Sequence, residues 1–340
     1  MPRFFAVFID VVSSIYGRIL RLALRIFEGL VNPIKMSNKI FGIFFLLTLV
    51  SCSNIGNEKN ILNVKTFPNR TQDFSLWQLE PFNEEVQMGY ILKADDGNII
   101  VVDGGGILTA PTLEAYIEQL GGTVHTWILS HPHLDHIGAF LEILNNKKVK
   151  IGGIVHVPLP VAWVEENEAI TVELLKQYNS AVAASNAEKM SVEVGDSFEL
   201  AEGVRMSVLN AFNENITQNA VNNSSLVFTL ESASKKILFL GDLGVKGGSD
   251  LLARTDSLVL KSNYVQMAHH GQQGVDKAFY KAVEAEYALW PTPKWLWENR
   301  ADGQGYNTGN FMTFEVRAWM DELGIKTNYV SGLDGTIQID

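Results

Sequence analysis

Three histidines and an aspartate stand within six positions of one short run, HPHLDHIG, at His131, His133, Asp135 and His136. Buried polar groups at this density need partners, which restricts the folds that can hold the run. A strand precedes it, so the extended backbone points the first two imidazoles the same way. Asp135 and His136 lie where the chain turns into a helix, and they face a neighbouring point. Two imidazoles for one ion, and a carboxylate with an imidazole for a second, outline a dinuclear metal site.

The surrounding elements predict an α/β (α+β) fold. A strand is expected at 124–129, and apolar residues at 137, 140, 141 and 144 predict the helix after the motif. A hairpin is expected at 90–102. Further helices are expected at 112–120, 249–254, 276–285 and 314–323, and further strands at 151–155, 191–200, 206–210, 226–230, 236–240, 264–268, 327–330 and 336–339. This order predicts two mixed sheets packed together and flanked by helices.

The N-terminal part of the chain has the composition of a targeting segment. Residues 36–52 read MSNKIFGIFFLLTLVSC, a basic residue followed by an apolar run and small residues. The run is shorter than the roughly 20 residues that span a bilayer, and the order is that of a secretory signal peptide. Its end resembles the lipobox of bacterial lipoproteins, which implies a lipid on Cys52; the alternative is a buried helix. Cys52 is the only cysteine, which excludes an internal disulfide and a thiolate metal site.

These features predict four parts of the chain. Residues 1–35 are either a basic amphipathic helix on a membrane surface or a gene-model artefact, with translation starting at Met36. We favour the artefact, because a signal peptide lies at the true N-terminus. Residues 36–52 are the signal peptide, 53–74 a polar tether and 75–340 the folded domain. The expected location is the cell envelope, anchored to the membrane on its periplasmic or cell-surface side.

The charge balance argues against a polyanionic partner. Without residues 1–51 the chain loses six of its 27 basic and two of its 38 acidic residues, so its net charge changes from −11 to −15. Such a field repels nucleic acid unless a local basic groove intervenes, and the sequence has no basic cluster with interleaved aromatic residues. We expect a small-molecule substrate, and no protein partner is evident.

HPHLDHIG resembles the HxHxDH signature of the metallo-β-lactamase superfamily, and further motifs follow the family's order. Asp103 in IVVDGGG, Asp242 in ILFLGDLG and His269 in VQMAHHG resemble three of them, and GLDGTIQI resembles the last hairpin. The resemblance covers residues 75–340 and implies an αββα sandwich with two metal ions, zinc or alternatively manganese. The implied metal ligands are His131, His133, Asp135, His136, Asp242 and His269. Asp242 would bridge both ions, and Asp103 would support the ligands.

The chain departs from the family pattern in one interval. Most members supply a third histidine to the first ion between the second and fourth motifs, where this chain has Asn222-Asn223-Ser224-Ser225. An amide, a water or His156 is then the remaining ligand, although His156 is equally consistent with a structural role. His125 is expected to be structural. His269 is expected to bind metal, and His270 to contact substrate or donate a proton.

The resemblance extends to a branch with phosphodiester chemistry. NNSSLVFTL and His269-His270-Gly271 look like the hydrolase domain of the ComEC competence proteins, and bacterial phosphorylcholine esterases also look related. The expected function is hydrolysis of phosphodiesters or related esters by a metal-activated hydroxide, with Asp135, His270 and Asp103 as the catalytic candidates. The alternatives are a lactonase or thioesterase, and a lipoprotein that only binds ligand. Trp290, Trp295 and Trp297 are expected either to line the substrate pocket or to seal the core.

Overall fold

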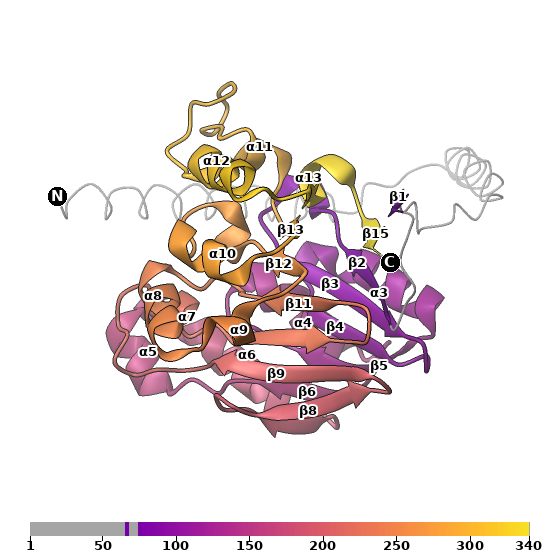
Figure 1. Cartoon of the computed structure of the whole chain (residues 1–340). Coiled ribbons are helices and arrows are strands. Elements are labelled where there is room, and N and C mark those ends of the chain that lie inside the picture. The colour runs from indigo at the N-terminus through magenta and orange to yellow at the C-terminus, as the bar shows by residue number, and fades with distance from the viewer. Residues whose placement is uncertain (1–64, 68–73, 340) are drawn as a thin grey trace, which may run out of the picture. The chain divides into compact units, whose positions relative to one another are not determined.

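Two mixed β-sheets pack face to face in the structure, a computed structural model that describes residues 65–67 and 74–339. In Figure 1 the second sheet lies in front of the first. In order across the first sheet, the strands are β1 (Lys65–Phe67), β15 (Ile337–Ile339), β2 (Phe74–Gln78), β3 (Gly89–Ala94), β4 (Ile99–Asp103), β5 (Thr123–Ile128), β6 (Lys150–His156) and β7 (Glu188–Ser191). The second sheet runs β14 (Thr327–Val330), β13 (Tyr287–Trp290), β12 (Tyr264–Gln266), β11 (Lys236–Phe239), β10 (Val227–Glu231), β9 (Val204–Asn210) and β8 (Ser197–Ala201).

Helices cover the outer face of each sheet, which confirms the predicted arrangement of two mixed sheets flanked by helices (Figure 1). The α-helices are α3 (Ala110–Leu120), α4 (Leu134–Asn146), α5 (Val161–Asn167), α6 (Val172–Ala184), α7 (Ala220–Asn223), α8 (Val245–Arg254), α9 (Ser257–Leu260), α10 (Lys277–Val283), α11 (Lys294–Trp297), α12 (Thr313–Leu323) and α13 (Ser331–Asp334). Short 3-10 turns are η1 (Phe82–Glu84), η2 (Ile107–Thr109), η3 (Ala169–Thr171) and η4 (Ala268–Gly271). In the described residues, no helix has both the length and the apolar character to cross a bilayer.

Three apolar layers hold the sandwich together. Between the sheets, Phe239 stacks on Phe228, with ring centroids 5.0 Å apart, and meets Tyr90 of the other sheet edge-on at 5.3 Å. The outer layers seat α3, α4 and α6 on the first sheet and α8, α10 and α12 on the second. Because strands alternate their side chains between faces, a strand buried on both faces is apolar throughout, as β4 is up to Asp103.

The parallel strands bring the polar residues of the sequence motifs to one edge of each sheet. In the first sheet β4, β5 and β6 are parallel, and in the second β11, β12, β13 and β14 are parallel. Their carboxyl ends therefore lie at one edge of each sheet, which is where ligands collect in such sheets. Asp103 ends β4, the histidine motif follows β5, and Asp242 follows β11. The chain order thus places the sequence motifs together.

Several stretches differ from the sequence expectation, among them the closing hairpin, since β14 belongs to the second sheet and β15 to the first. The strand expected at 191–200 is two strands, β7 in the first sheet and β8 in the second, because the chain turns at Gly195, where φ is +98°. The segment 53–74, expected to be a tether, contains β1, which pairs in parallel with β15, and Phe74, the first residue of β2. The expected signal peptide and the residues before it lie outside the described residues.

Candidate metal centre

Asp103 is a fully buried carboxylate around which the histidine motif is arranged. It has a left-handed φ of 54° at the end of β4, a conformation that is rare for residues other than glycine and clusters at functional sites. Its Oδ1 accepts from the Ser130 backbone N–H at 2.7 Å, and its Oδ2 accepts from the Ser130 hydroxyl at 2.7 Å. His136 Nδ1–H also donates to Oδ2, at 2.7 Å. The carboxylate therefore fixes both the motif loop and one imidazole.

His131 and His133 form the first pair of the centre. His131 Nε2 lies 3.1 Å from His133 Nδ1, so two ring nitrogens converge on one point. The Ser130 hydroxyl gives its only proton to Asp103, so it accepts from His131 Nδ1–H at 3.0 Å. His131 Nε2 is therefore the nitrogen with a free lone pair. The arrangement suits two nitrogen ligands of a single ion.

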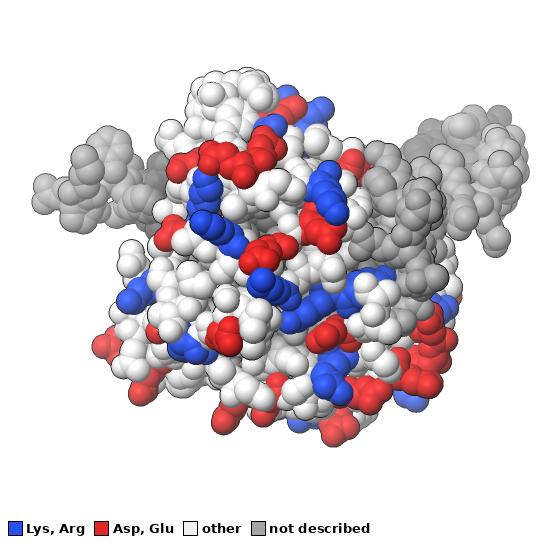
Figure 2. Space-filling model, viewed as in Figure 1, with Lys and Arg blue, Asp and Glu red and all other residues white. Residues whose placement is uncertain are grey.

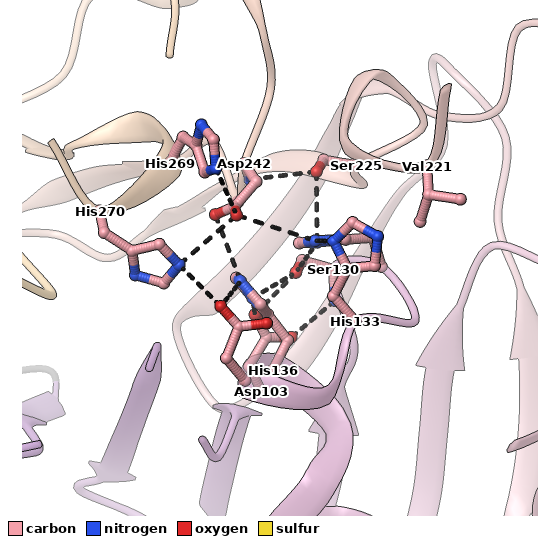
Figure 3. A network of polar contacts seen from close by, with 12 residues as sticks. Asp103, Ser130, His133, His136, Val221, Ser225, Asp242, His269 and His270 are labelled. Atoms are coloured by element: carbon pink, nitrogen blue, oxygen red, sulfur yellow. Dashed lines mark hydrogen bonds and ion pairs between the residues drawn. The ribbon is translucent and has the colours of Figure 1, made fainter. Parts of the chain in front are cut away.

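A second group, which we call the four-residue cluster, consists of Asp135, His136, Asp242 and His270. One ligand atom from each lies within 4.8 Å of the others. Figure 3 shows His136, Asp242 and His270 of this cluster pointing toward one another. His136 Nε2 is 3.2 Å from Asp242 Oδ1, and His270 Nε2 is 3.2 Å from Asp135 Oδ2 and 3.4 Å from Asp242 Oδ2. His131 Nε2 is also 3.9 Å from Asp242 Oδ2. Asp242 therefore faces both the cluster and the first pair.

Three buried atoms of the cluster show that it suits a cation. His136 Nε2, His270 Nε2 and Asp242 Oδ1 make no hydrogen bond of good geometry in the described part of the chain, although ion-pair contacts with Asp135 and among themselves bring them close together. Unsatisfied buried polar atoms are costly, and here they converge on one point with the donor chemistry of imidazole and carboxylate. A divalent ion would satisfy all three at once. These residues therefore fit a divalent metal ion.

The loop before Asp242 is built to aim that carboxylate inward. The buried side chain of Gln266 accepts from the Leu240 backbone N–H at 2.8 Å and donates to the Gly241 carbonyl at 3.1 Å. Gly241 has φ +53°, and a Cβ there would lie 2.9 Å from Ser225 Oγ. Only glycine fits without a shift, so the Gly-Asp pair of the motif has a packing reason.

The structure brings His270, rather than His269, into the four-residue cluster. His270 is 1% exposed, whereas the His269 side chain is 26% exposed and its Nε2 lies 3.8 Å from Asp242 Oδ2. Both residues have left-handed φ values, 51° and 56°, which turn consecutive side chains toward the same carboxylate (Figure 3). The cluster of possible metal-binding groups therefore contains the buried His270, whereas His269, the ligand expected from the sequence, is the more exposed imidazole.

Five histidines, at positions 131, 133, 136, 269 and 270, surround the centre. In each ring, the nitrogen that faces away from the centre donates a hydrogen bond. The acceptors are Ser130 Oγ for His131, Glu168 Oε1 for His133, Asp103 Oδ2 for His136, the Gln273 carbonyl for His269 and the Pro291 carbonyl for His270. Such outer contacts set the tautomer of a ligating histidine. Four rings present Nε2 to the centre, and His133 alone presents Nδ1. The sequence reasoning missed Ser130, Ser225 and Glu168, and no motif marks Glu168.

Opposed charges shift the pKa values of the cluster when no cation is bound. Burial acts to lower the pKa of His270, but Asp242 and Asp135 raise it to about 9. Burial also opposes the charged form of His136, yet Asp242 and Asp135 hold its pKa well above the usual range. For His131, burial and the neighbouring imidazoles hold the pKa well below it. His131 is therefore ready to ligate at neutral pH, whereas the cluster exchanges protons for an ion.

The interval that lacks a third histidine contributes hydroxyl and amide groups. Ser225 Oγ lies 3.4 Å from His131 Nδ1 and accepts from the Asp242 backbone N–H at 3.1 Å. Asn222 is buried, and its Oδ1 has no hydrogen-bond partner among the described residues. His156 instead contacts the Tyr178 hydroxyl at 2.8 Å, and burial lowers the pKa of the imidazole. His125 is exposed and accepts from the Ile99 backbone N–H at 2.9 Å.

The tryptophan segment divides between the two expected roles. Trp290 is fully buried in β13, and its indole N–H donates to Asn328 Oδ1 at 2.8 Å. Trp295 donates to the Glu84 carbonyl at 2.8 Å and lines a pocket of about 880 Å³ with Phe311 and Arg300. Trp290 therefore seals the core, whereas Trp295 is available to a ligand.

One family model matches the chain, and several solved structures are similar to it at low sequence identity. A family model described as the metallo-beta-lactamase superfamily matches residues 84–271, more than half of the chain. The chain is similar to the metallo-beta-lactamase fold protein YhfI from Bacillus subtilis, at 12% identity and a TM-score of 0.47 over 76% of this chain and 96% of that one. It is similar to Igni18, a metallo hydrolase from the archaeon Ignicoccus hospitalis, at 14% identity and a TM-score of 0.47, over 78% and 99%. Zn(2+)-bound PqqB from Methylobacterium extorquens is similar at 12% identity and a TM-score of 0.45, over 75% and 87%. No curated protein matches the sequence.

Proposed function

This chain belongs to the metallo-β-lactamase superfamily, and on that basis we propose that it is a metal-dependent hydrolase of phosphodiesters or related esters. The single observation that carries the proposal is the convergence of His136 Nε2, His270 Nε2 and Asp242 Oδ1, three buried atoms that lie in ion-pair contact without well-formed hydrogen bonds. A site that only stabilised the fold would satisfy these atoms within the protein. We also propose that the centre takes two ions, zinc or manganese, with the first at His131 and His133.

The residues of the centre would divide the work of hydrolysis. When bound, a divalent ion lowers the pKa of a coordinated water from 15.7 to about 7 and stabilises negative charge on the reacting oxygen. Asp242 faces both groups of ligands and would hold them at a fixed separation. Asp135 and His270 would complete the cluster. His269, whose side chain is partly exposed beside Asp242, would contact the substrate or donate a proton to its leaving oxygen.

The phosphodiester assignment and the envelope location have separate support. The first comes from the resemblance of residues 222–230 and of His269-His270-Gly271 to the ComEC-like branch, and the second from the lipobox-like end at Cys52. A small substrate also accords with the charge pattern, because acidic and basic side chains are interspersed on the face drawn in Figure 2.

Metal analysis and a substrate panel test the proposal. Full-length protein purified without chelator should hold close to two zinc or manganese ions and should hydrolyse bis-p-nitrophenyl phosphate faster than lactones, thioesters or nitrocefin. A lactone or thioester preference would keep the hydrolase and change its substrate. Less than one ion after reconstitution, with no turnover, would contradict the hydrolase.

A ligand-binding lipoprotein is the second candidate, and one observation favours it. The first pair supplies only two imidazoles, because the interval that carries the third histidine in most relatives holds Asn222 to Ser225 here. Such a chain would hold one ion in the four-residue cluster and bind a substrate-like anion without turnover. One ion per chain with retained anion binding would support this candidate.

A further inference from the structure

Glu168 contacts the first pair of histidines from outside every sequence motif. His133 Nε2 lies 2.6 Å from Glu168 Oε1, and both side chains are partly buried. Glu168 stands at the junction of α5 and η3, 35 residues beyond His133. A short contact between a partly buried imidazole and a carboxylate is the arrangement that fixes the orientation of ligating histidines in metal sites.

The backbone of Glu168 is held from both sides. Its N–H donates to the Val164 carbonyl at 2.7 Å, and its carbonyl accepts from the Thr171 N–H at 3.0 Å. The side chain is held as firmly, because Oε1 accepts from the Thr171 hydroxyl at 2.8 Å and Oε2 accepts from the Val221 N–H at 3.1 Å. All of these protein groups are donors, so the carboxylate acts only as an acceptor. His133 Nε2 must then carry the proton in this contact.

We propose that Glu168 is a positioning residue that holds His133 protonated on Nε2, so that Nδ1 is the nitrogen presented to an ion beside His131 Nε2. This rests on the proposed function, in which an ion binds at the first pair. His133 is the one ring of the five that presents Nδ1, and Glu168 supplies the acceptor that this reversed orientation requires. Through Val221, the same carboxylate anchors α7, the segment in the interval without a third histidine. Glu168 thus compensates for a sparse ligand set by restricting one of its members.

Imidazole NMR of the metal-free full-length protein tests the contact without relying on activity. In the native protein, His133 should show an Nε2–H proton that exchanges slowly with solvent, because the carboxylate holds it. In Glu168→Gln this proton should exchange quickly, since an amide is a weaker acceptor and its NH₂ group competes for the same position. Glu173→Gln is the matched control, because Glu173 is exposed and pairs with Lys176 within α6.

Zinc titration followed on the same resonances tests the consequence. Binding of the ion that shifts the His133 ring should weaken about 10- to 100-fold in Glu168→Gln and remain unchanged in Glu173→Gln. Binding of the ion that shifts the His136 resonances should weaken far less. A native His133 without a proton on Nε2, or equal zinc affinities in both variants, would overturn the proposal. The native spectrum decides the first of these even if Glu168→Gln does not fold. Failure of the hydrolase proposal would instead appear as native protein that binds zinc without turnover or does not bind it.

Discussion

Asp242 is the residue at which the two groups of ligands meet. Its Oδ1 lies 3.2 Å from His136 Nε2, and its Oδ2 lies 3.9 Å from His131 Nε2. Asp242→Ala should therefore remove a charge from both positions and abolish activity most completely. His133→Ala should rank next, since it weakens one position. Asp103→Ala should be mildest, about 10- to 100-fold, because Asp103 acts through His136 and Ser130. Steady-state rates on the substrate found by the panel check the order, with circular dichroism as the folding control; an active Asp242→Ala with both ions would refute the bridge.

Alanine substitutions of His269 and of His270 should have different effects on the metal content of the protein. His270→Ala should lose the ion of the four-residue cluster, because His270 Nε2 is a buried member of that cluster. His269→Ala should keep its ions and lose turnover, because the His269 side chain is 26% exposed beside the centre. Elemental analysis of both purified variants makes the distinction. Retention of two ions by His270→Ala together with their loss from His269→Ala would restore the assignment expected from the sequence.

Stability of the metal-free protein should depend on pH through His270. Burial acts to lower the pKa of His270, but Asp242 and Asp135 raise it to about 9, above the usual histidine value of about 6.5. A group whose pKa is raised on folding contributes stability that is fully present below the unfolded value and is lost as pH rises through the folded one. The melting temperature of chelated protein should therefore fall between pH 6.5 and 9, with a smaller fall in His270→Gln. Zinc affinity should rise over the same range, because the ion displaces the proton. An identical pH profile in both proteins would contradict the charge assignment.

At the scale of elements, the loop between β11 and α8 places Asp242 and depends on glycine. Gly241→Ala adds a Cβ 2.9 Å from Ser225 Oγ and 3.1 Å from Ser130 Cβ, at a left-handed φ. Gly97→Ala is the matched control, since Gly97 also has a positive φ but has no atom within 4 Å of the added Cβ. Both should lose about 1–2 kcal/mol of unfolding free energy in urea from backbone strain. Only Gly241→Ala should also lose zinc affinity, by tenfold or more, and equal affinities would show that the loop adapts.

Periodicity predicted the elements that carry the motifs, and it failed where the chain changes sheets. The helix after the motif and the strands ending at Asp103 and before Asp242 were expected within a few residues, since local apolar patterns specify them. The 191–200 strand was wrong because alternation alone does not reveal the turn at Gly195. α6 was not predicted, although Val172, Leu175, Tyr178 and Val182 are buried at helical spacing.

The residues that meet at the centre could be predicted from the sequence, whereas the groups that hydrogen-bond to them could not. The spacing of His131 to His136 encodes local geometry, so it is readable from the sequence. Glu168 reaches His133 across 35 residues, and the Pro291 carbonyl reaches His270 across 21, so only the fold reveals them. The choice between His269 and His270 depends on two left-handed residues in succession, which no sequence pattern marks.

At the scale of the whole molecule, we predict that residues 1–51 are absent from the mature protein and that Cys52 carries lipid. The basic residue, the apolar run and the lipobox-like end motivate this prediction, and these residues lie outside the described structure. Labelled palmitate should be incorporated into the native protein and not into Cys52→Ala, with Cys52→Ser as a second variant. Incorporation that persists in both variants would show that the lipid, if present, is attached elsewhere.

The carboxyl ends of strands from both sheets meet at the centre, so an ion bound there would cross-link the two sheets. Asp103 and the histidine motif belong to the first sheet, and Asp242, His269 and His270 belong to the second. Removal of the ion would leave each sheet intact and would weaken the packing between the two sheets only along the edge that carries the centre. Amide hydrogens after β4, β5, β11 and β12 would then lose protection before those in the outer helices. The ion bound at the centre would thus also limit how far the two sheets can separate at that edge.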